Sequence, residues 1–511
     1  MRFSKTCAIL LMLLSSISLV HGQTDYRSLE GLGLEQSWLS RVQMNPARRG
    51  LVSITLSTNH APDAAYSIFE VAHDNGVTRF SEFDLGASGD VLGKQEAERL
   101  AEKEVIRRNA MGMNPKLTVR KIPPVTLFAT TNAGLAQAFD AETGRLIWSV
   151  SVGNPNYPMS AIGANDTFAA VLNGSTLYVL NRNTGKVELE RKLQSSPSSE
   201  PDSSPRLSRD WVFVPALSGQ MEAFHLYDET EPNWIYRARG DILGKPVITA
   251  ASAAWTTQDG RLFVSDANQP EILFRLETNS QFASGCAHLV PGQLFAASTN
   301  GYVYAIDETR EAITWESSTG KRIVQTPVAI GDSLYLVSSD ASLMRLDNKN
   351  GDLKWNVPHV NRVLAVSDSR IYVMDASDRL AVLDKQNGRR MGRSLKMKTK
   401  FQISNTSTDR LYLASAKGTL LCLREMDAVW PKIYNAPVAE TTEASDSTQA
   451  SPEGTETREE TPTIDDESDP FDFGDGGDDA AADDGGDDPF DFGGDDEASS
   501  DEAEEDPFDF E

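Results

Sequence analysis

The sequence predicts an all-β fold, a β-propeller of about eight four-stranded blades, with seven blades as the alternative number. Three observations predict this fold. A unit of about 40 residues recurs along the chain, each unit contains short runs of β-branched and aromatic residues, and tight turns with glycine join these runs. Repetition at such a period is typical of architectures in which each unit buries its faces against its neighbours.

The repeated unit is clearest at residues 138–148. Asp140 ends a β-rich run, Gly144 follows in the turn, and the chain returns to Trp148. The anchor positions 140 and 181 are 41 residues apart, 307 and 347 are 40 apart, and 347 and 384 are 37 apart. Each interval suits one blade. In the turn, the Asp or Asn side chain can accept backbone N–H groups while glycine takes a positive φ.

Because these residues recur with the unit, a structural role outweighs catalysis or cofactor stacking. We expect the tryptophans to pack between adjacent blades, with each indole N–H bonded to a backbone acceptor. We expect the aspartates to cap the turns. The predicted repeat-packing residues are Asp140, Gly144, Trp148, Gly185, Asp307, Trp315, Asp347, Gly351, Trp355, Asp384 and Gly388.

Each unit also contains pairs of short strand-like runs. Residues 334–337 and 343–346 are such a pair, separated by a polar turn. Less regular units at 211–234 and 262–274 and a last unit at 411–423 bring the number to eight. A β-sandwich has no reason to repeat its sequence at this period, and the Gly-His and Trp-Asp pairs of a WD40 propeller are absent.

The turn and tryptophan pattern resembles the PQQ-like repeat of quinoprotein dehydrogenases and of the outer-membrane-assembly propeller BamB. The resemblance covers roughly residues 117–434, is specific in the first, sixth and seventh units, and is loose in the third and fourth. In the dehydrogenases it implies a PQQ between a tryptophan and an adjacent-cysteine disulfide, beside a calcium ion. This chain has no adjacent cysteine pair. We therefore expect no catalytic residue, no metal ligand and no cofactor, with PQQ and calcium needed only under an oxidoreductase alternative.

Other candidate groups are scattered. Cys286 and Cys422 lie three units apart and are predicted to be unpaired, buried small hydrophobes. The most basic stretch, residues 389–400, is interpreted as a solvated outer blade edge, with an anion dock as the alternative. The remaining histidines lack the spacing of three to five residues that is typical of a zinc or copper site; they are His60, His73, His225, His288 and His359.

Residues 1–22 are predicted to be an export signal. A basic start is followed by an apolar run that serine residues interrupt and that falls short of the ~20 residues needed to span a bilayer. Cys7 precedes this run, so lipidation is not expected.

Residues 23–116 are predicted to form an N-terminal extension with helices, which packs on the propeller or completes one blade. Within it we expect a short helix or two at 29–44, a β-like piece at 51–56, and a surface helix at 94–110. The propeller is assigned to residues 117–434.

Residues 435–511 are predicted to be a disordered acidic tail. From residue 438 onward, 30 Asp and Glu residues face one basic residue, Arg458, so the rest of the chain is nearly neutral although the net charge is −27. Such a composition cannot bury enough apolar surface to offset the entropy lost on ordering. We expect weak association of divalent cations with this tail.

The tail carries three copies of the pentapeptide Asp-Pro-Phe-Asp-Phe. In an extended chain the two aromatic rings of each copy point the same way, and weak contacts of several copies add through multivalency. We predict a partner-binding motif that consists of Phe471, Phe473, Phe490, Phe492, Phe508 and Phe510.

These features predict a non-catalytic interaction scaffold of the cell envelope, in which the propeller presents rigid protein-binding surfaces and the tail recruits a partner. The chain is expected to be exported to a periplasm, the cell envelope or the exterior, to be monomeric, and to have no transmembrane segment and no nucleic-acid partner. Two alternatives stay open: a PQQ-dependent or related oxidoreductase, and a propeller that binds a small ligand or glycan in its central channel.

Overall fold

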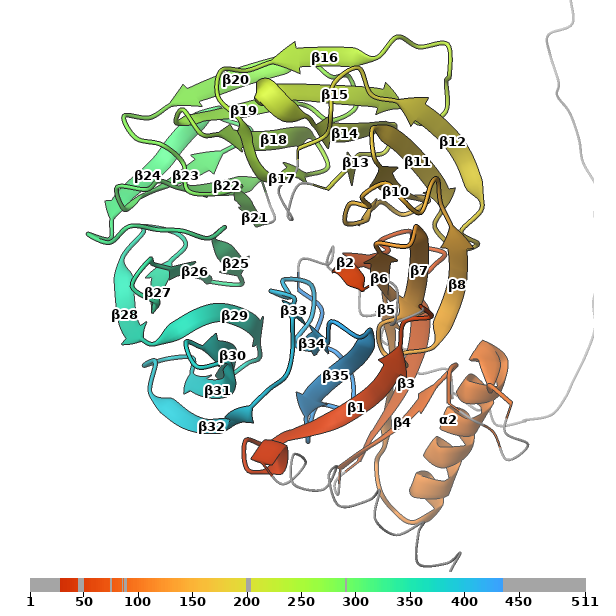
Figure 1. Cartoon of the computed structure of the whole chain (residues 1–511). Coiled ribbons are helices and arrows are strands. Elements are labelled where there is room, and N and C mark those ends of the chain that lie inside the picture. The colour runs from red at the N-terminus through yellow and green to blue at the C-terminus, as the bar shows by residue number, and fades with distance from the viewer. Residues whose placement is uncertain are drawn as a thin grey trace, which may run out of the picture. The chain divides into compact units, whose positions relative to one another are not determined.

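The computed structural model describes residues 28–434, apart from residues 45–49, 74–75, 85, 87–89, 199–203 and 290–291. The predicted export signal and acidic tail lie outside the described residues. Within the described part, eight four-stranded antiparallel sheets form a ring, and one three-stranded sheet belongs to an insertion (Figure 1). The predicted eight-bladed β-propeller is confirmed.

Blades 2 to 7 each consist of four strands that follow one another in sequence from the centre of the ring outward. Their strands, blade by blade, are β9 (Gly163–Ala164), β10 (Phe168–Asn173), β11 (Thr176–Asn181) and β12 (Val187–Lys192); β13 (Arg206–Leu207), β14 (Trp211–Pro215), β15 (Gln220–His225) and β16 (Trp234–Arg237); β17 (Ile242–Ile248), β18 (Ser252–Thr257), β19 (Arg261–Asp266) and β20 (Ile272–Glu277); β21 (Ala287–Leu289), β22 (Gln293–Ala297), β23 (Tyr302–Asp307) and β24 (Ala312–Ser318); β25 (Val328–Ile330), β26 (Ser333–Val337), β27 (Ser342–Asp347) and β28 (Leu353–Pro358); β29 (Val360–Val366), β30 (Arg370–Asp375), β31 (Arg379–Asp384) and β32 (Arg390–Lys396).

The apolar runs of the sequence become the middle strands of the blades. Every residue of β14 and β26 is buried, whereas the outer strand β20 alternates between half-buried and exposed positions. A strand that is covered on both faces reads as a continuous apolar run, and a strand at the rim alternates. The core is therefore not one central cluster but a series of apolar layers between neighbouring blades.

Blades 1 and 8 are completed by the beginning of the described chain, which closes the ring. The outer strand of blade 8 is β1, which pairs antiparallel with β35, and the inner strand of blade 1 is β2, which pairs with β6. Blade 8 contains β33 (Phe401–Gln402), β34 (Leu411–Ala414), β35 (Thr419–Glu425) and β1 (Leu34–Arg41), and blade 1 contains β2 (Leu51–Thr58), β6 (Val125–Thr131), β7 (Leu135–Asp140) and β8 (Leu146–Ser151).

This closure corrects two expectations. The helix expected within residues 29–44 is wrong at 34–41, where the chain forms β1. Pairing with β35 makes this segment a strand, and a register shift between Gln36 and Trp38 lets the buried Leu34 pack against blade 7 and the buried Trp38 against blade 1. The N-terminal extension was expected to pack on the propeller or to complete one blade. Its strands β1 and β2 complete two blades, so the ring is not confined to residues 117–434, and the β-like piece at 51–56 is part of β2.

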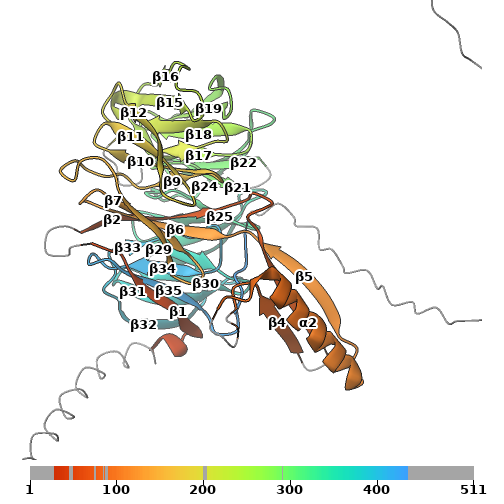
Figure 2. The same cartoon turned by 90° about the vertical axis from the view of Figure 1, so that its right-hand side faces the viewer.

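A small α/β insertion separates β2 from β6. It contains β3 (Tyr66–His73), β4 (Gly76–Ser81), α2 (Gly93–Ala110) and β5 (Lys116–Ile122), with the strands in the order β4-β3-β5. The predicted helix at 94–110 is confirmed. Ala97 and Ala101 are fully buried against Phe69 and Val71 of the sheet. Figure 2 shows α2 and β5 projecting from the ring.

A buried arginine links blade 8 to blade 1. The side chain of Arg410 is fully buried, and its Nε atom lies 3.3 Å from Glu142 Oε2 of blade 1. Its terminal nitrogens donate to the carbonyl oxygens of Ala428 and Val429, each at 2.9 Å. Burial raises the pKa of Glu142 and of the neighbouring Asp409, so these carboxyl groups depend on the guanidinium to stay ionised.

Replacing Arg410 should therefore destabilise the closed ring. Arg410→Met is expected to lower the free energy of unfolding by about 3–5 kcal/mol, because it leaves buried acceptors without their charged donor. The matched control is Arg424→Met in the same blade. Arg424 pairs with Glu35 at 2.7 Å but is partly exposed, and exposed pairs contribute about 0–1 kcal/mol. Urea denaturation followed by tryptophan fluorescence measures both; equal losses would contradict a special role for Arg410.

Candidate functional site

The recurring aspartates lie in turns at the ends of third strands. Asp140 Oδ1 accepts hydrogen bonds from the backbone N–H groups of Glu142 at 3.1 Å and Thr143 at 2.8 Å. Asp307, Asp347 and Asp384 accept backbone N–H groups in the same way, each in a different blade. These carboxylates are used inside their own turns and do not converge on one site.

The recurring tryptophans reach from the outer strand of one blade to the turn of the next. Trp148 of blade 1 donates its indole N–H to the carbonyl oxygen of Arg182 in blade 2 at 2.7 Å. Its ring lies against Gly185, where an added Cβ would come within 2.7 Å of ring carbons. Only glycine leaves room for the indole at this position, and the positive φ of Gly185 favours glycine independently.

The same contact recurs farther around the ring. Trp315 of blade 5 donates to the Asn348 carbonyl at 2.9 Å, and Trp355 of blade 6 donates to the Lys385 carbonyl at 3.1 Å. Their rings lie against Gly351 and Gly388 respectively. We name this arrangement, an indole on a turn glycine with its N–H on the adjoining carbonyl, the tryptophan dock.

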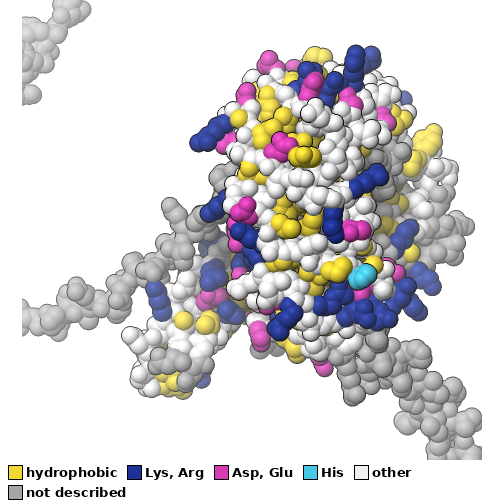
Figure 3. Space-filling view, turned by 90° about the vertical axis from the view of Figure 1, so that its left-hand side faces the viewer, with side chains coloured by type: hydrophobic (Ala, Val, Ile, Leu, Met, Phe, Trp, Pro, Cys, Tyr) yellow, Lys and Arg dark blue, Asp and Glu magenta, His cyan; other side chains and the backbone are white. Residues whose placement is uncertain are grey.

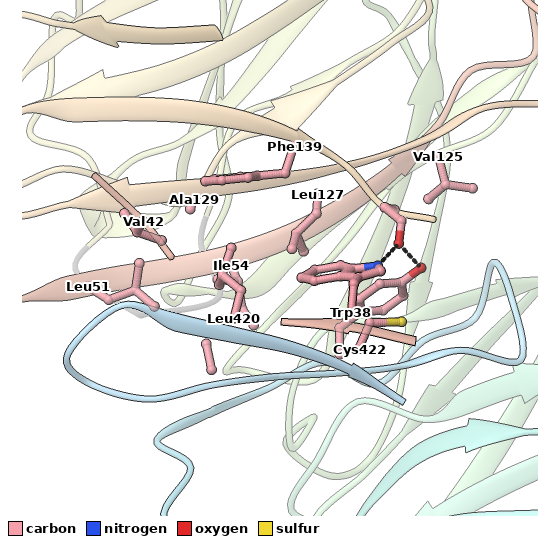
Figure 4. Close-up of a cluster of buried hydrophobic side chains, with 13 residues drawn as sticks. Trp38, Val42, Leu51, Ile54, Val125, Leu127, Ala129, Phe139, Leu420 and Cys422 are labelled. Carbon is pink, nitrogen blue, oxygen red and sulfur yellow. Dashed lines mark hydrogen bonds between the residues drawn. The ribbon is translucent and has the colours of Figure 1, made fainter. Parts of the chain in front are cut away.

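Trp38 forms a tryptophan dock at the ring closure, and the sequence analysis missed it. Its indole N–H donates to the Ala141 carbonyl at 2.8 Å, and the hydroxyl of Tyr412 donates to the same oxygen at 3.2 Å (Figure 4). A Cβ on Gly144 would lie 2.5 Å from the Trp38 ring. Trp38 precedes the repeats, so periodicity does not point to it. The sequence did contain one indication of Trp38. Gly144 is a turn glycine of the first unit, so no preceding unit supplies the tryptophan that would pack on it.

Some turns keep the capping function with a different residue. In blade 3, His225 stands in place of the aspartate, and its Nδ1 atom accepts the N–H of Asp228 at 2.8 Å. Because histidine replaces aspartate here, the third unit resembles the repeat only loosely in the sequence.

At the boundary from blade 7 to blade 8, Gly392 stands opposite Val382, and the side chain of Leu32 occupies the space beside it.

The side chains brought together do not fit the PQQ pocket of quinoprotein dehydrogenases. Trp148 and Trp355 are buried between blades. Cys286 and Cys422 are unpaired and buried, as predicted, the first between blades 4 and 5 and the second between blades 8 and 1. Among the described residues, no three His, Cys, Asp or Glu side chains are grouped so that they could hold a metal ion.

The most basic stretch, residues 389–400, includes the outer strand β32 of blade 7. Arg393 lies 3.4 Å from Asp375, and Lys396 lies 3.2 Å from Asp378. Figure 3 shows Lys and Arg side chains gathered with acidic ones on the lower part of the face that it presents. A charged outer strand of this kind discourages pairing with other sheet edges. Within residues 28–434 as described, no helix is both long and apolar enough to cross a membrane.

Comparisons with known proteins agree with this geometry. A family model described as outer membrane protein assembly factor BamB matches residues 124–275 and 258–399. BamB of Yersinia pestis is 22% identical over 280 residues, which are 52% of this chain and 62% of that protein. BamB of Shewanella oneidensis is 22% identical over 204 residues, 35% of this chain and 50% of that protein. The chain thus spans about half to three fifths of the length of these curated relatives.

One solved structure can be compared as well. The crystal structure of BamB from Moraxella catarrhalis is similar with a TM-score of 0.47 and 20% sequence identity, over 59% of this chain and 92% of that chain.

The tryptophan dock makes a prediction that separates steric overlap from backbone strain. Gly185→Ala is expected to lower the free energy of unfolding by about 2–5 kcal/mol, of which about 1–2 comes from the left-handed backbone and about 1–3 from overlap with the indole. Gly331→Ala is the matched control, because Gly331 also has a positive φ (+60°) but nothing lies within 4 Å of its added Cβ. Chemical denaturation should show that Gly331→Ala lowers the free energy of unfolding by the backbone contribution alone, about 1–2 kcal/mol.

A double-mutant cycle completes this test. In a Trp148→Ala background the overlap disappears, so Gly185→Ala should cost only the backbone part. If the cost of Gly185→Ala is the same with and without Trp148, the indole does not set the requirement for glycine.

The two cysteines provide a prediction about reactivity. Burial raises the pKa of Cys286 to about 12 and raises that of Cys422 as well, and the thiolate is the reactive form. Iodoacetamide at a pH near 8 is expected to leave both thiols unmodified in the folded protein and to modify both in denaturant. Peptide mapping by mass spectrometry measures each site; rapid native labelling of either one would contradict its buried position.

Proposed function

Because the chain belongs to the family of the outer membrane protein assembly factor BamB, we propose that it is a non-catalytic scaffold that binds protein partners in the cell envelope during outer-membrane assembly. One observation carries the proposal: the family match runs through the repeated units, and the recurring aspartates and tryptophans of these units are used in turns and tryptophan docks. The functional capacity of the propeller then lies in its exposed surface.

The closed ring suits this role because it holds its surface in one shape. Each blade packs on both faces against its neighbours. Strand β1, from the beginning of the described chain, pairs with β35 and so completes the last blade. A surface that is already ordered loses little conformational entropy on binding. Several large apolar side chains stay exposed and are candidates for partner contacts. They are Tyr157 and Tyr227 on loops and Leu217 in a short 3-10 helix.

We further propose that the acidic tail recruits a partner through its three Asp-Pro-Phe-Asp-Phe copies. Their support is in the sequence, where the six phenylalanines are nearly the only large apolar residues of residues 438–511. A partner with several basic grooves would gain affinity from the three copies together. The proposal includes export by the segment 1–22 to the periplasm or cell surface, a monomeric chain, and loose association of divalent cations with the tail carboxylates.

Affinity capture from an envelope extract after brief cross-linking tests both parts. The full chain is compared with a chain in which all six tail phenylalanines are changed to alanine. We expect the full chain to retain a defined set of envelope proteins and the variant to lose at least one of them, because the aromatic contacts are gone.

The matched control changes six tail residues outside the motifs to alanine: Ser445, Ser447, Thr448, Ser451, Thr455 and Thr457. This control should retain the same proteins as the unchanged chain. If the phenylalanine variant retains an unchanged set, the tail does not recruit a partner. If no chain retains an envelope protein, the scaffold function itself is wrong.

A further inference from the structure

The repeat pattern is broken at the boundary from blade 3 to blade 4. In the turn after Asp266, Pro270 stands at the position that holds glycine in the docked turns. Trp234 holds the tryptophan position of blade 3, opposite Ala223. Its ring stacks on Tyr236, with centroids 5.9 Å apart and planes inclined by 11°. The turn carbonyl of Asn268 instead accepts the indole N–H of Trp211 from an inner strand, at 2.9 Å.

A pocket of about 230 Å³ opens on the same boundary, at the other ends of its strands. The lining residues Arg261 and Glu277 form the cross-strand pair of β19 and β20 that lies farthest from the turn at Pro270. The pocket lies between the outer strand β16 of blade 3 and the strands β19 and β20 of blade 4. Figure 1 shows β16 and β20 at the rim of the ring. The lining of the pocket combines two aromatic rings, Tyr236 and Phe263, with four arginines, Arg237, Arg239, Arg261 and Arg275. The two rings are themselves in edge contact, with centroids 5.3 Å apart.

The charges of this arginine pocket are only partly balanced. Glu277 is the one acidic residue of the lining, and it pairs with both Arg261 at 2.9 Å and Arg275 at 3.0 Å. Asp259 lies 2.5 Å from Arg261. Arg237 and Arg239 are exposed and form no ion pair with any described residue. A local excess of positive charge thus stands on a body that is nearly neutral as a whole.

The chemistry of the pocket selects its ligand. A guanidinium group offers a planar fork of donors that matches a carboxylate, and arginine clusters are a recurring means of recognising acidic motifs. The half-buried ring of Tyr236 offers an apolar face for an aromatic side chain, whereas the ring of Phe263 is fully buried. The volume is below the ~300–1,000 Å³ that is typical of small-molecule sites, so it suits one or two side chains of a peptide.

We propose that the arginine pocket is a docking site for a short acidic peptide of a partner protein, with carboxylates on Arg237 and Arg239 and an aromatic residue against Tyr236. The inference deepens the proposed scaffold function by naming the chemistry of one partner segment. A binding test with purified components distinguishes failure of the peptide site from failure of the scaffold function, because the peptide can bind even where envelope capture fails.

The experiment measures binding of a fluorescent peptide with the sequence Asp-Asp-Pro-Phe-Asp-Phe-Gly-Gly by anisotropy, using the full chain. This peptide has the required chemistry and occurs at residues 487–494. Changing both Arg237 and Arg239 to alanine should raise the Kd at least about tenfold, because two charge-assisted contacts are lost. The matched control changes Arg209 and Arg310, which are 88% and 81% exposed and lie outside the pocket, to alanine. It should leave the Kd within about twofold.

Further measurements make the outcome decisive. Peptides with Asp→Asn or with Phe→Ala changes should each bind more weakly, and unchanged thermal unfolding of the arginine variants excludes misfolding. Equal weakening by the pocket and control variants would overturn the site. Displacement of the peptide by inorganic phosphate alone, with no effect of the Phe→Ala change, would assign the pocket to phosphate groups and overturn the peptide. Tighter binding of the free peptide to a chain with all six tail phenylalanines replaced would assign the pocket to the chain's own tail and overturn the partner source.

Discussion

The ring has to close, and that constraint governs the rest of this structure. A sheet in a propeller is stable only when both faces are covered, so the last blade needs the first as much as any blade needs its neighbour. Here the contact depends on strand β1, which pairs with β35 while Trp38 reaches to Ala141 of blade 1. The buried Arg410 adds a charged connection between the same two blades. In a ring closed in this way, both faces of the first and the last blade are covered by a neighbouring blade.

Closure also explains which parts of the architecture the sequence could reveal. The turn with Asp, glycine and tryptophan is local, so it can be read from consecutive residues, and it led to the correct fold and number of blades. Helix α2 was also predictable, because its small apolar positions Ala97 and Ala101 recur with a helical period. The pairing of Leu34–Arg41 with Thr419–Glu425 joins opposite ends of the described chain. No local pattern contains that information, and so β1 was taken for a helix.

The candidate site shows the same division. Where the unit keeps its residues, as at Trp148 and Gly185, the contact partners follow from the repeat. Where the unit changes, as at His225 and Pro270, the sequence shows only a loose copy, and the consequence appears once the blades are placed side by side. The arginine pocket draws Arg237 and Arg239 from one blade and Arg261 and Arg275 from the next. Each is unremarkable among the charged residues of the sequence, and only the adjacency of β16 to β19 and β20 makes them a group.

A repeated contact and a recognition site place opposite demands on a propeller. The tryptophan dock works because it is the same at several boundaries, each indole filling the space that a glycine leaves and satisfying one carbonyl. A surface repeated around a ring would bind the same ligand at several places and select none. Specific recognition needs a boundary unlike the others. At the boundary between blades 3 and 4, Pro270 replaces the turn glycine and Trp211 takes over the hydrogen bond to the turn. At the other ends of the same strands, side chains of the two blades form the basic pocket. The inner aromatic packing of Trp255 and Phe263 keeps this boundary closed beneath the pocket, so the two blades stay packed together although no tryptophan dock joins them.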